Sequence, residues 1–105
     1  MNIFSKSTQL STGSSWEIEP AACTPSAFQL IDIREDEEVR QESLVGLPFL
    51  HLPLSTFDPS SLDRQRPYLF FCRSGKRSHS LVSALRRQGW ENVYSLKGSF
   101  KELPT

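Results

Sequence analysis

Short apolar runs, separated by polar and proline-containing segments, recur along the chain. The run Tyr68–Phe71 is uninterrupted and leads directly into Cys72. About four to eight continuous apolar residues between breakers are typical of a strand buried on both faces, as in parallel sheets. Other apolar segments predict four further strands, at 16–18, 28–33, 49–52 and 93–96.

Helical spacing appears soon after the cysteine. Over 79–88 the apolar residues fall on one side of a helix, and Gly89 follows where a helix end favours positive φ. Acidic residues at its start predict a short helix over 35–41, and prolines indicate helical turns within 19–23 and 57–65. Because strands alternate with helical segments, we predict an α/β fold: an open, mostly parallel five-stranded sheet with helices on both faces.

This arrangement places Cys72 in a strand-loop-helix turn, at the carboxyl end of a strand. The first N–H groups of a helix lack internal partners and favour negative charge. Arg73, Lys76 and Arg77 add positive charge to the same loop. A thiol in this position is expected to shift towards thiolate, which is the nucleophile. A buried structural cysteine is the alternative.

The loop Cys72-Arg73-Ser74-Gly75-Lys76-Arg77-Ser78 resembles the active-site loop of single-domain rhodanese-like sulfurtransferases. Three more segments resemble family motifs in the same order: Leu30–Glu35, Leu52–Ser55 and Gly89–Gly98. The resemblance implies a five-stranded rhodanese-like fold. The chain departs from the family pattern at Ser43–Phe49, before the third strand, and at Gly98-Ser99, where a glycine pair is often found.

The resemblance also implies sulfur transfer through a persulfide on Cys72. The donor would be a small thiosulfate-like anion, and the acceptor a thiol, cyanide or a sulfur-carrier protein. The loop N–H groups from Arg73 to Ser78 would stabilise the sulfur anion, while the arginines hold the donor. Asp32 and Arg34 lie at the carboxyl end of the second strand, on the same edge of the sheet as Cys72, and are expected to support the site. Asp32 would either pair with a loop arginine or cap the next helix.

Two other functions share features of this pattern. Cysteine-dependent phosphatases and arsenate reductases place an arginine six residues after the cysteine, to contact a tetrahedral oxyanion. Here that position is Ser78, and the arginine comes one residue earlier, at Arg77. The second alternative is a non-catalytic rhodanese-like module that binds a partner protein, since a fold does not by itself imply a function.

The composition supports one domain of ordinary globular type. The chain has 105 residues, and we expect a polar N-terminal tail over 1–15 followed by the rhodanese-like domain over 16–105. Twelve basic and 12 acidic residues give no net charge, so neither nucleic acid nor a membrane is an expected partner. The start of the chain lacks the apolar core of a signal peptide, so the expected location is the cytoplasm.

The remaining reactive residue types have plainer interpretations. Nothing near Cys23 in the sequence activates its thiol, and in a reducing cytoplasm two cysteines favour chemistry over a disulfide. His79 falls in the first turn of a helix and is expected at the surface, and His51 in a core or edge strand. No cysteine and histidine cluster has metal-ligand spacing, so we expect neither a metal nor a cofactor.

Overall fold

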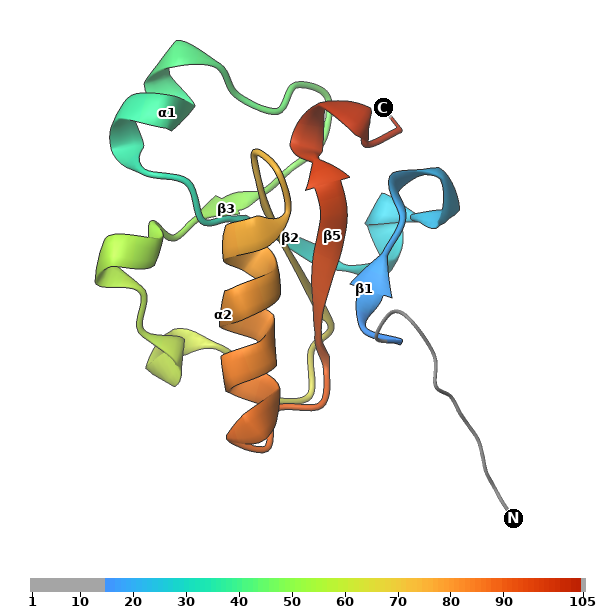
Figure 1. Ribbon diagram of the computed structural model, residues 1–105, viewed down its shortest axis with the longest axis vertical. Helices are drawn as coiled ribbons and strands as arrows, with labels where there is room; N and C mark the ends of the chain where they lie inside the picture. The colour runs from blue at the N-terminus through green and yellow to red at the C-terminus, as the bar shows by residue number, and fades with distance from the viewer. Residues whose placement is uncertain (1–14, 105) are drawn as a thin grey trace.

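A single five-stranded sheet forms the centre of the molecule (Figure 1). The computed structural model describes residues 15–104, so the expected polar tail lies outside the described residues except for Ser15. Every strand pairing is parallel, and the strand order is β1-β5-β4-β2-β3. The strands are β1 (Glu17–Ile18), β2 (Gln29–Asp32), β3 (Leu50–His51), β4 (Tyr68–Cys72) and β5 (Val93–Ser99).

The predicted α/β fold is confirmed, with some shifts in element boundaries. Each expected strand is present, although β3 is only two residues long and β5 runs to Ser99 instead of residue 96. The two α-helices are α1 (Asp36–Gln41) and α2 (Lys76–Arg87), and short 3₁₀ turns lie at Pro20–Ala22, Pro25–Ala27, Leu54–Thr56, Pro59–Ser61 and Phe100–Glu102.

Side chains of β4 alternate between the two faces of the sheet and build two core layers. Phe70 and Cys72 belong to the layer beneath α2, together with Val82 of that helix. Phe71 belongs to the opposite layer, which also holds Cys23 and Phe100. All five residues of β4 are buried, as a central strand of a parallel sheet requires. The two cysteines of the chain therefore lie in different layers.

Helix α2 begins at Lys76, earlier than the apolar spacing indicated. Its buried positions are Ser78, Val82 and Leu85, so the buried stripe starts with a serine that a hydrophobic pattern does not reveal. Gly89 has a φ of 97°, and the Trp90 N–H donates to the carbonyl of Leu85 at 3.1 Å, which closes the helix as predicted.

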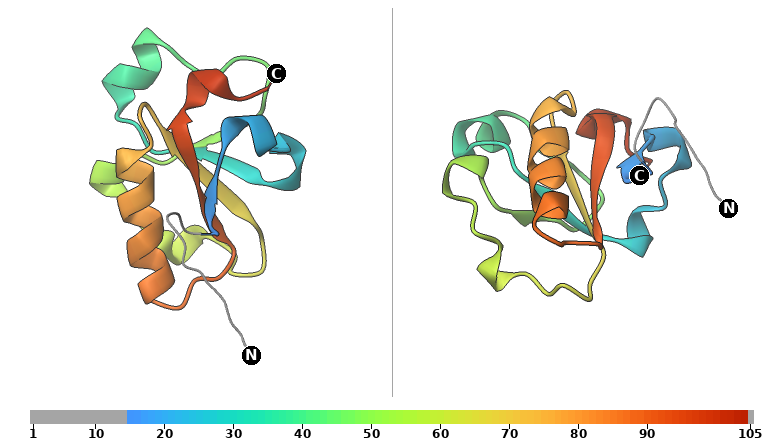
Figure 2. Two further views of the ribbon diagram at one scale, coloured as in Figure 1. Left: turned by 45° about the vertical axis from the view of Figure 1, so that its right-hand side comes forward. Right: turned by 60° about the horizontal axis from the view of Figure 1, so that its bottom comes forward.

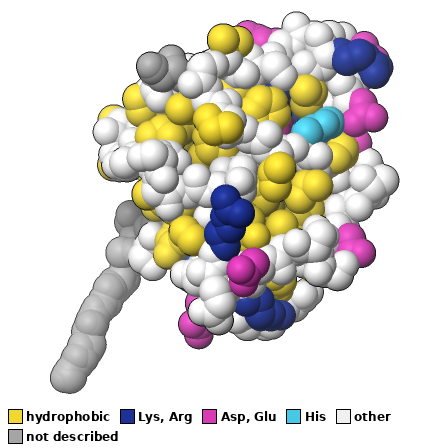
Figure 3. All heavy atoms as spheres, turned by 180° about the vertical axis from the view of Figure 1, so that it is seen from behind, with side chains coloured by type: hydrophobic (Ala, Val, Ile, Leu, Met, Phe, Trp, Pro, Cys, Tyr) yellow, Lys and Arg dark blue, Asp and Glu magenta, His cyan; other side chains and the backbone are white. Residues whose placement is uncertain are grey.

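Helix α1 lies beyond the carboxyl ends of the strands and near the loop that follows β4, and none of its residues is buried (Figures 1 and 2). The face opposite α2 is covered by 3₁₀ turns and irregular segments, with partly buried Phe28, Leu47 and Phe49 packed against its core. Seen from behind, apolar side chains gather on this face (Figure 3). Among the described residues, no helix has the length and apolar character needed to cross a bilayer.

Candidate active site

Cys72 is the last residue of β4, and its side chain is fully buried at 0 % exposure. The pairing of β4 with β5 is irregular between Phe70 and Cys72, a feature that often re-aims a side chain beside an active site. The Gly75 N–H donates to the Cys72 Sγ at 3.2 Å, and the Ser78 hydroxyl lies 3.7 Å from the same sulfur. The thiol therefore faces hydrogen-bonding groups of the loop and the first turn of α2.

These contacts favour the ionised sulfur. Burial alone would raise the pKa of the Cys72 thiol, but hydrogen bonds from the Ser78 backbone and hydroxyl, and from the backbone N–H groups of Ser74 and Gly75, outweigh it and lower the pKa below its ordinary value. In contrast, burial without such partners raises the pKa of Cys23. The two thiols of this chain are thus expected to differ in reactivity at neutral pH.

Alkylation by iodoacetamide should show this difference. In a Cys23→Ser protein, the alkylation rate of Cys72 should reach half its maximum at a lower pH than a free model thiol does, because the thiolate persists to lower pH. In a Cys72→Ser protein, the midpoint for Cys23 should lie above the model value. A Cys72 midpoint at or above that of the model thiol would show that the loop does not stabilise an anion.

Gly75 shapes the loop through its missing side chain. It precedes α2 with a φ of 91°, a region that residues with a Cβ rarely adopt. A Cβ built on Gly75 would lie 2.7 Å from the Gly98 nitrogen and 3.2 Å from the Leu96 carbonyl oxygen. The loop therefore packs directly on the backbone of β5, and this contact sets the position of the N–H group that reaches Cys72.

The Arg77 guanidinium is paired with a carboxylate of α1. Its two terminal nitrogens lie 2.8 Å from the two carboxylate oxygens of Glu38, and this pairing holds the pKa of Glu38 at about 2. Glu38 also accepts the Glu35 N–H, while the Glu35 side chain accepts the Glu38 N–H, in a capping box at the start of α1. Arg77, expected from the sequence to contact an anionic donor, thus joins α2 to α1.

Asp32 and Arg34 form a buried ion pair with each other. The Arg34 Nη2 lies 2.9 Å from the Asp32 carboxylate, and both side chains have 0 % exposure. The expectations that Asp32 pairs with a loop arginine or caps the next helix were both wrong, because its oxygens are taken by the Arg34 side chain and backbone N–H. The guanidinium also lies 4.1 Å from the Phe100 ring centroid and donates to the Glu42 carbonyl at 2.8 Å.

The pair therefore holds α1 in place, and α1 in turn presents Glu38 to Arg77. Arg34 donates to the carbonyl of Glu38, within α1, and to that of Glu42, the residue that follows the helix. Asp32 and Arg34 lie on the face of the sheet opposite Cys72, since residues that alternate along β2 place Ile31 and Ile33 in the layer beneath α2. Their contacts thus reach the site through α1 and not by touching the thiol.

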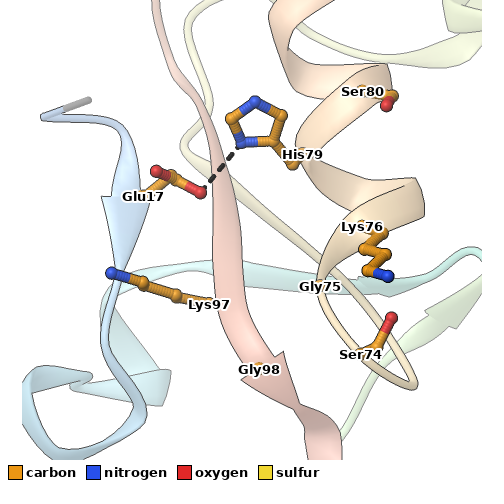
Figure 4. Close-up of a pocket in the computed structure, with 8 residues that line it drawn as sticks. All are labelled: Glu17, Ser74, Gly75, Lys76, His79, Ser80, Lys97 and Gly98. Atoms are coloured by element: carbon orange, nitrogen blue, oxygen red, sulfur yellow. Dashed lines mark hydrogen bonds and ion pairs between the residues drawn. The ribbon is translucent and has the colours of Figure 1, made fainter. Parts of the chain in front are cut away.

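A pocket of about 380 Å³ lies beside the loop, between β1, β5 and the start of α2 (Figure 4). Glu17 and His79 point toward one another there, with 2.8 Å between the Glu17 Oε2 and the His79 Nδ1. The expectation of a surface histidine at position 79 is confirmed, and so is the edge position of His51 in β3. The pocket is lined by Glu17, Ser74, Gly75, Lys76, His79, Ser80, Lys97 and Gly98.

The other two loop cations are exposed. Arg73 lies 3.8 Å from Glu42, with 56 % of its side chain exposed. Lys76 lines the pocket and is exposed as well. Both can approach a small anion at the surface of the loop. Within residues 15–104, no three His, Cys, Asp or Glu side chains lie close enough together to hold a metal ion.

A family model described as the rhodanese-like domain matches residues 21–103. The chain belongs to the rhodanese-like domain family. The predicted resemblance is therefore confirmed over most of the chain.

Several relatives of this rhodanese-like chain carry sulfurtransferase names. It is 31 % identical over 74 residues to a Coxiella burnetii protein named thiosulfate sulfurtransferase GlpE, covering 69 % of this chain and 67 % of that protein. It is 32 % identical over 69 residues to a protein of Allochromatium vinosum named sulfurtransferase, covering 66 % and 64 %. The matched region spans only 62 % and 59 % of two Bacillus subtilis relatives, YtwF and YqhL.

Solved structures agree with the fold. A rhodanese-related protein from Thermoplasma volcanium superposes with a TM-score of 0.69 at 25 % identity, covering 81 % of this chain and 86 % of that one. The single-domain sulfurtransferase RDL2 of Saccharomyces cerevisiae superposes with a TM-score of 0.62 over 89 % of this chain and 91 % of that one, at 16 % identity.

Three residues of this rhodanese-like site were missed by reasoning from the sequence. Glu38 was interpreted only as one of several acids that favour a helix start, although it pairs with Arg77. Ser95 was counted only as part of a strand, although its hydroxyl lies 2.8 Å from that of Ser78. Gly98 was noted as a motif residue, without its contact to the loop. The local signal for Ser95 is a polar residue within a predicted buried strand, because such a residue needs a hydrogen-bond partner inside the protein.

Proposed function

We propose that this rhodanese-like domain is a sulfurtransferase that moves sulfane sulfur from a small anionic donor such as thiosulfate to a thiophilic acceptor, through a persulfide on Cys72. One observation carries the proposal: a thiol of lowered pKa at the carboxyl end of β4 accepts the Gly75 N–H beside the start of α2. The sulfurtransferase names of its relatives support the same class of reaction.

The chemistry divides into two displacements at sulfur. The Cys72 thiolate attacks the outer sulfur of thiosulfate, a new sulfur–sulfur bond forms, and sulfite leaves with the electron pair of the bond that breaks. The Cys72 persulfide anion then gives its terminal sulfur to the acceptor, which becomes thiocyanate if it is cyanide or a persulfide if it is a thiolate, and the Cys72 thiolate is restored. Backbone N–H groups around the sulfur stabilise the anion in both steps.

Phosphatase or arsenate chemistry fits the geometry less well. Such a reaction needs a guanidinium that encloses a tetrahedral oxyanion together with the loop N–H groups. The position six residues after the cysteine is Ser78, whose hydroxyl faces the sulfur, and Arg77 is bound through both terminal nitrogens to Glu38. The site suits a single sulfur anion better than a phosphate.

Incubation with thiosulfate, followed by intact-protein mass spectrometry, tests the proposal directly. The expected result is the gain of one sulfur atom, which is lost again on addition of cyanide. The Cys72→Ser protein should gain no sulfur, and the Cys23→Ser protein should behave like the wild type. Hydrolysis of an aryl phosphate without any sulfur gain would support phosphatase chemistry, and inertness to both reagents would support a docking module.

The Arg77–Glu38 pair predicts opposite effects of two substitutions on the KM for thiosulfate. Removing the positive charge in Arg77→Ala should raise KM about tenfold, whereas Glu38→Gln frees the guanidinium to attract the anion and should lower it. Added salt should reduce both effects. Glu37→Gln is the matched control, because Glu37 lies on the same helix, pairs with Arg40 at the surface and should leave KM unchanged. Equal changes for Glu38→Gln and Arg77→Ala would contradict a charge effect and indicate a shared loss of structure.

A further inference from the structure

Two buried hydroxyl groups lie in a row behind the thiol. Ser78 has 0 % exposure and Ser95 has 1 %, so neither hydroxyl is open to bulk solvent and each needs a partner inside the protein. The Ser95 hydroxyl donates to the Ser78 Oγ at 2.8 Å. The Ser78 Oγ lies 3.3 Å from the Gly75 carbonyl oxygen and 3.7 Å from the Cys72 Sγ. The row therefore leads from β5, through the first turn of α2, to the sulfur.

We propose that Ser95 is a positioning residue for Cys72: by donating to the Ser78 Oγ, it leaves the Ser78 hydrogen free to turn to the sulfur once that sulfur is ionised. The benefit of this hydrogen bond to catalysis rests on the proposed function, because a persulfide mechanism begins from the thiolate. Its effect on the ionisation of the thiol depends only on the side chains of Cys72, Ser78 and Ser95.

Each thiol and hydroxyl hydrogen of this row has an acceptor in both the protonated and the ionised state of Cys72. In the protonated state, the Cys72 S–H donates to the Ser78 Oγ, and the Ser78 O–H donates to the Gly75 carbonyl. When the thiol proton leaves to water, the Ser78 O–H turns from that carbonyl to the thiolate. The Gly75 carbonyl is not left without a partner, because it keeps the His79 N–H at 3.0 Å. Ser95 donates to the Ser78 Oγ in both states.

This constant bond favours the ionised state. Hydrogen bonds in a chain polarise one another, so a Ser78 hydroxyl that accepts from Ser95 is a stronger donor. A stronger donor gains more from an anionic acceptor than from a neutral one. The Ser95–Ser78 bond is therefore worth more when Ser78 faces a thiolate than when it faces the Gly75 carbonyl.

The position of Ser95 is fixed by strands on both sides. It is aligned with Phe70 of β4 and with Glu17 of β1, and its N–H donates to the Trp16 carbonyl at 2.9 Å. Only rotation about the Cα–Cβ bond can move its hydroxyl. A group held by a central strand orients its partner more reliably than one on a loop.

The pH dependence of iodoacetamide alkylation tests this role in the Cys23→Ser background. Ser78→Ala should slow alkylation of Cys72 at pH 7 by roughly tenfold, through loss of a hydrogen bond to a charged group. Ser95→Ala should slow it about threefold, since Ser78 remains but is a weaker donor. Both substitutions should move the midpoint upward and leave the plateau at high pH unchanged, because the plateau reports access and not ionisation. Ser83→Ala is the control and should leave the midpoint unchanged, because the Ser83 hydroxyl is also on α2 but contacts Arg87 instead of the thiol.

The double substitution gives the decisive comparison. If Ser95 acts through Ser78, adding Ser95→Ala to Ser78→Ala should produce no further upward shift of the midpoint. An equal shift in both backgrounds would overturn the proposal, and so would a change confined to the plateau or an unchanged midpoint in Ser95→Ala. Alkylation needs no turnover, so a wild-type protein that gains no sulfur from thiosulfate would contradict the proposed function while leaving this measurement valid.

Discussion

Replacement of Cys72 by serine is expected to abolish sulfur transfer, lowering the rate by on the order of 10⁴-fold or more, while the protein stays folded. Serine is nearly isosteric with cysteine, and its hydroxyl can accept the Gly75 N–H that now reaches the sulfur. It lacks the polarizable sulfur nucleophile, and at neutral pH it is not ionised. Steady-state thiocyanate formation from thiosulfate and cyanide measures the loss.

Cys23→Ser is the matched control for this prediction. Cys23 is also buried, but it lies in the core layer on the other face of the sheet. Its replacement should leave turnover unchanged, although burying a hydroxyl in an apolar layer can lower the melting temperature. Substantial turnover in Cys72→Ser, or loss only in Cys23→Ser, would show that the nucleophile has been misassigned.

Removal of the Arg34 side chain should lower the free energy of unfolding by roughly 3–5 kcal/mol, because Asp32 would keep a buried charge without its partner. Arg34→Ala also deletes the contacts to the α1 carbonyls and to the Phe100 ring. Urea unfolding measures the change. Arg40→Ala is the control, since Arg40 is an exposed arginine of α1 paired with Glu37, and such pairs contribute only about 0–1 kcal/mol.

A second comparison separates the charge from the packing. If the loss arises mainly from the unpaired carboxylate, Asp32→Asn combined with Arg34→Ala should recover a large part of the stability lost in Arg34→Ala alone. A double variant no more stable than Arg34→Ala would show that the arginine acts through packing and through its carbonyl contacts. An Arg34→Ala protein as stable as Arg40→Ala would contradict the buried ion pair altogether.

The sequence was most informative where chemistry depends on neighbours along the chain. The apolar run of β4, the glycine and the cations after it, and the apolar spacing of α2 all lie within one continuous segment, so local patterns placed Cys72 correctly at a strand-to-helix turn. The parallel sheet followed from the alternation of strands and helices. The start of α2 was missed because its first buried residue, Ser78, is polar.

The partners of the site side chains were much harder to predict. Arg77 binds Glu38, and Ser78 binds Ser95, through contacts between elements that are distant in the sequence. A carboxylate near a helix start stabilises that helix whether or not it also pairs with an arginine. The sequence position of Glu38 therefore explains its presence without indicating its contact with Arg77. Asp32 was expected either to pair with a loop arginine or to cap the next helix, yet it binds the guanidinium of Arg34, which is two residues away on the same face of the sheet.

The packing of Gly75 on Gly98 has a consequence for the order in which this protein becomes reactive. The loop obtains its shape from β5, which is synthesised after the other four strands of the sheet, and the contact between Ser78 and Ser95 also needs β5. We expect a nascent chain that ends before β5 to carry Cys72 as an ordinary thiol, because the N–H groups that stabilise its anion are not yet in place. Refolding from urea with pulses of iodoacetamide near neutral pH would show this. Fast alkylation should appear together with the final folding phase, and its appearance in an earlier, partly folded population would mean that the loop forms without β5.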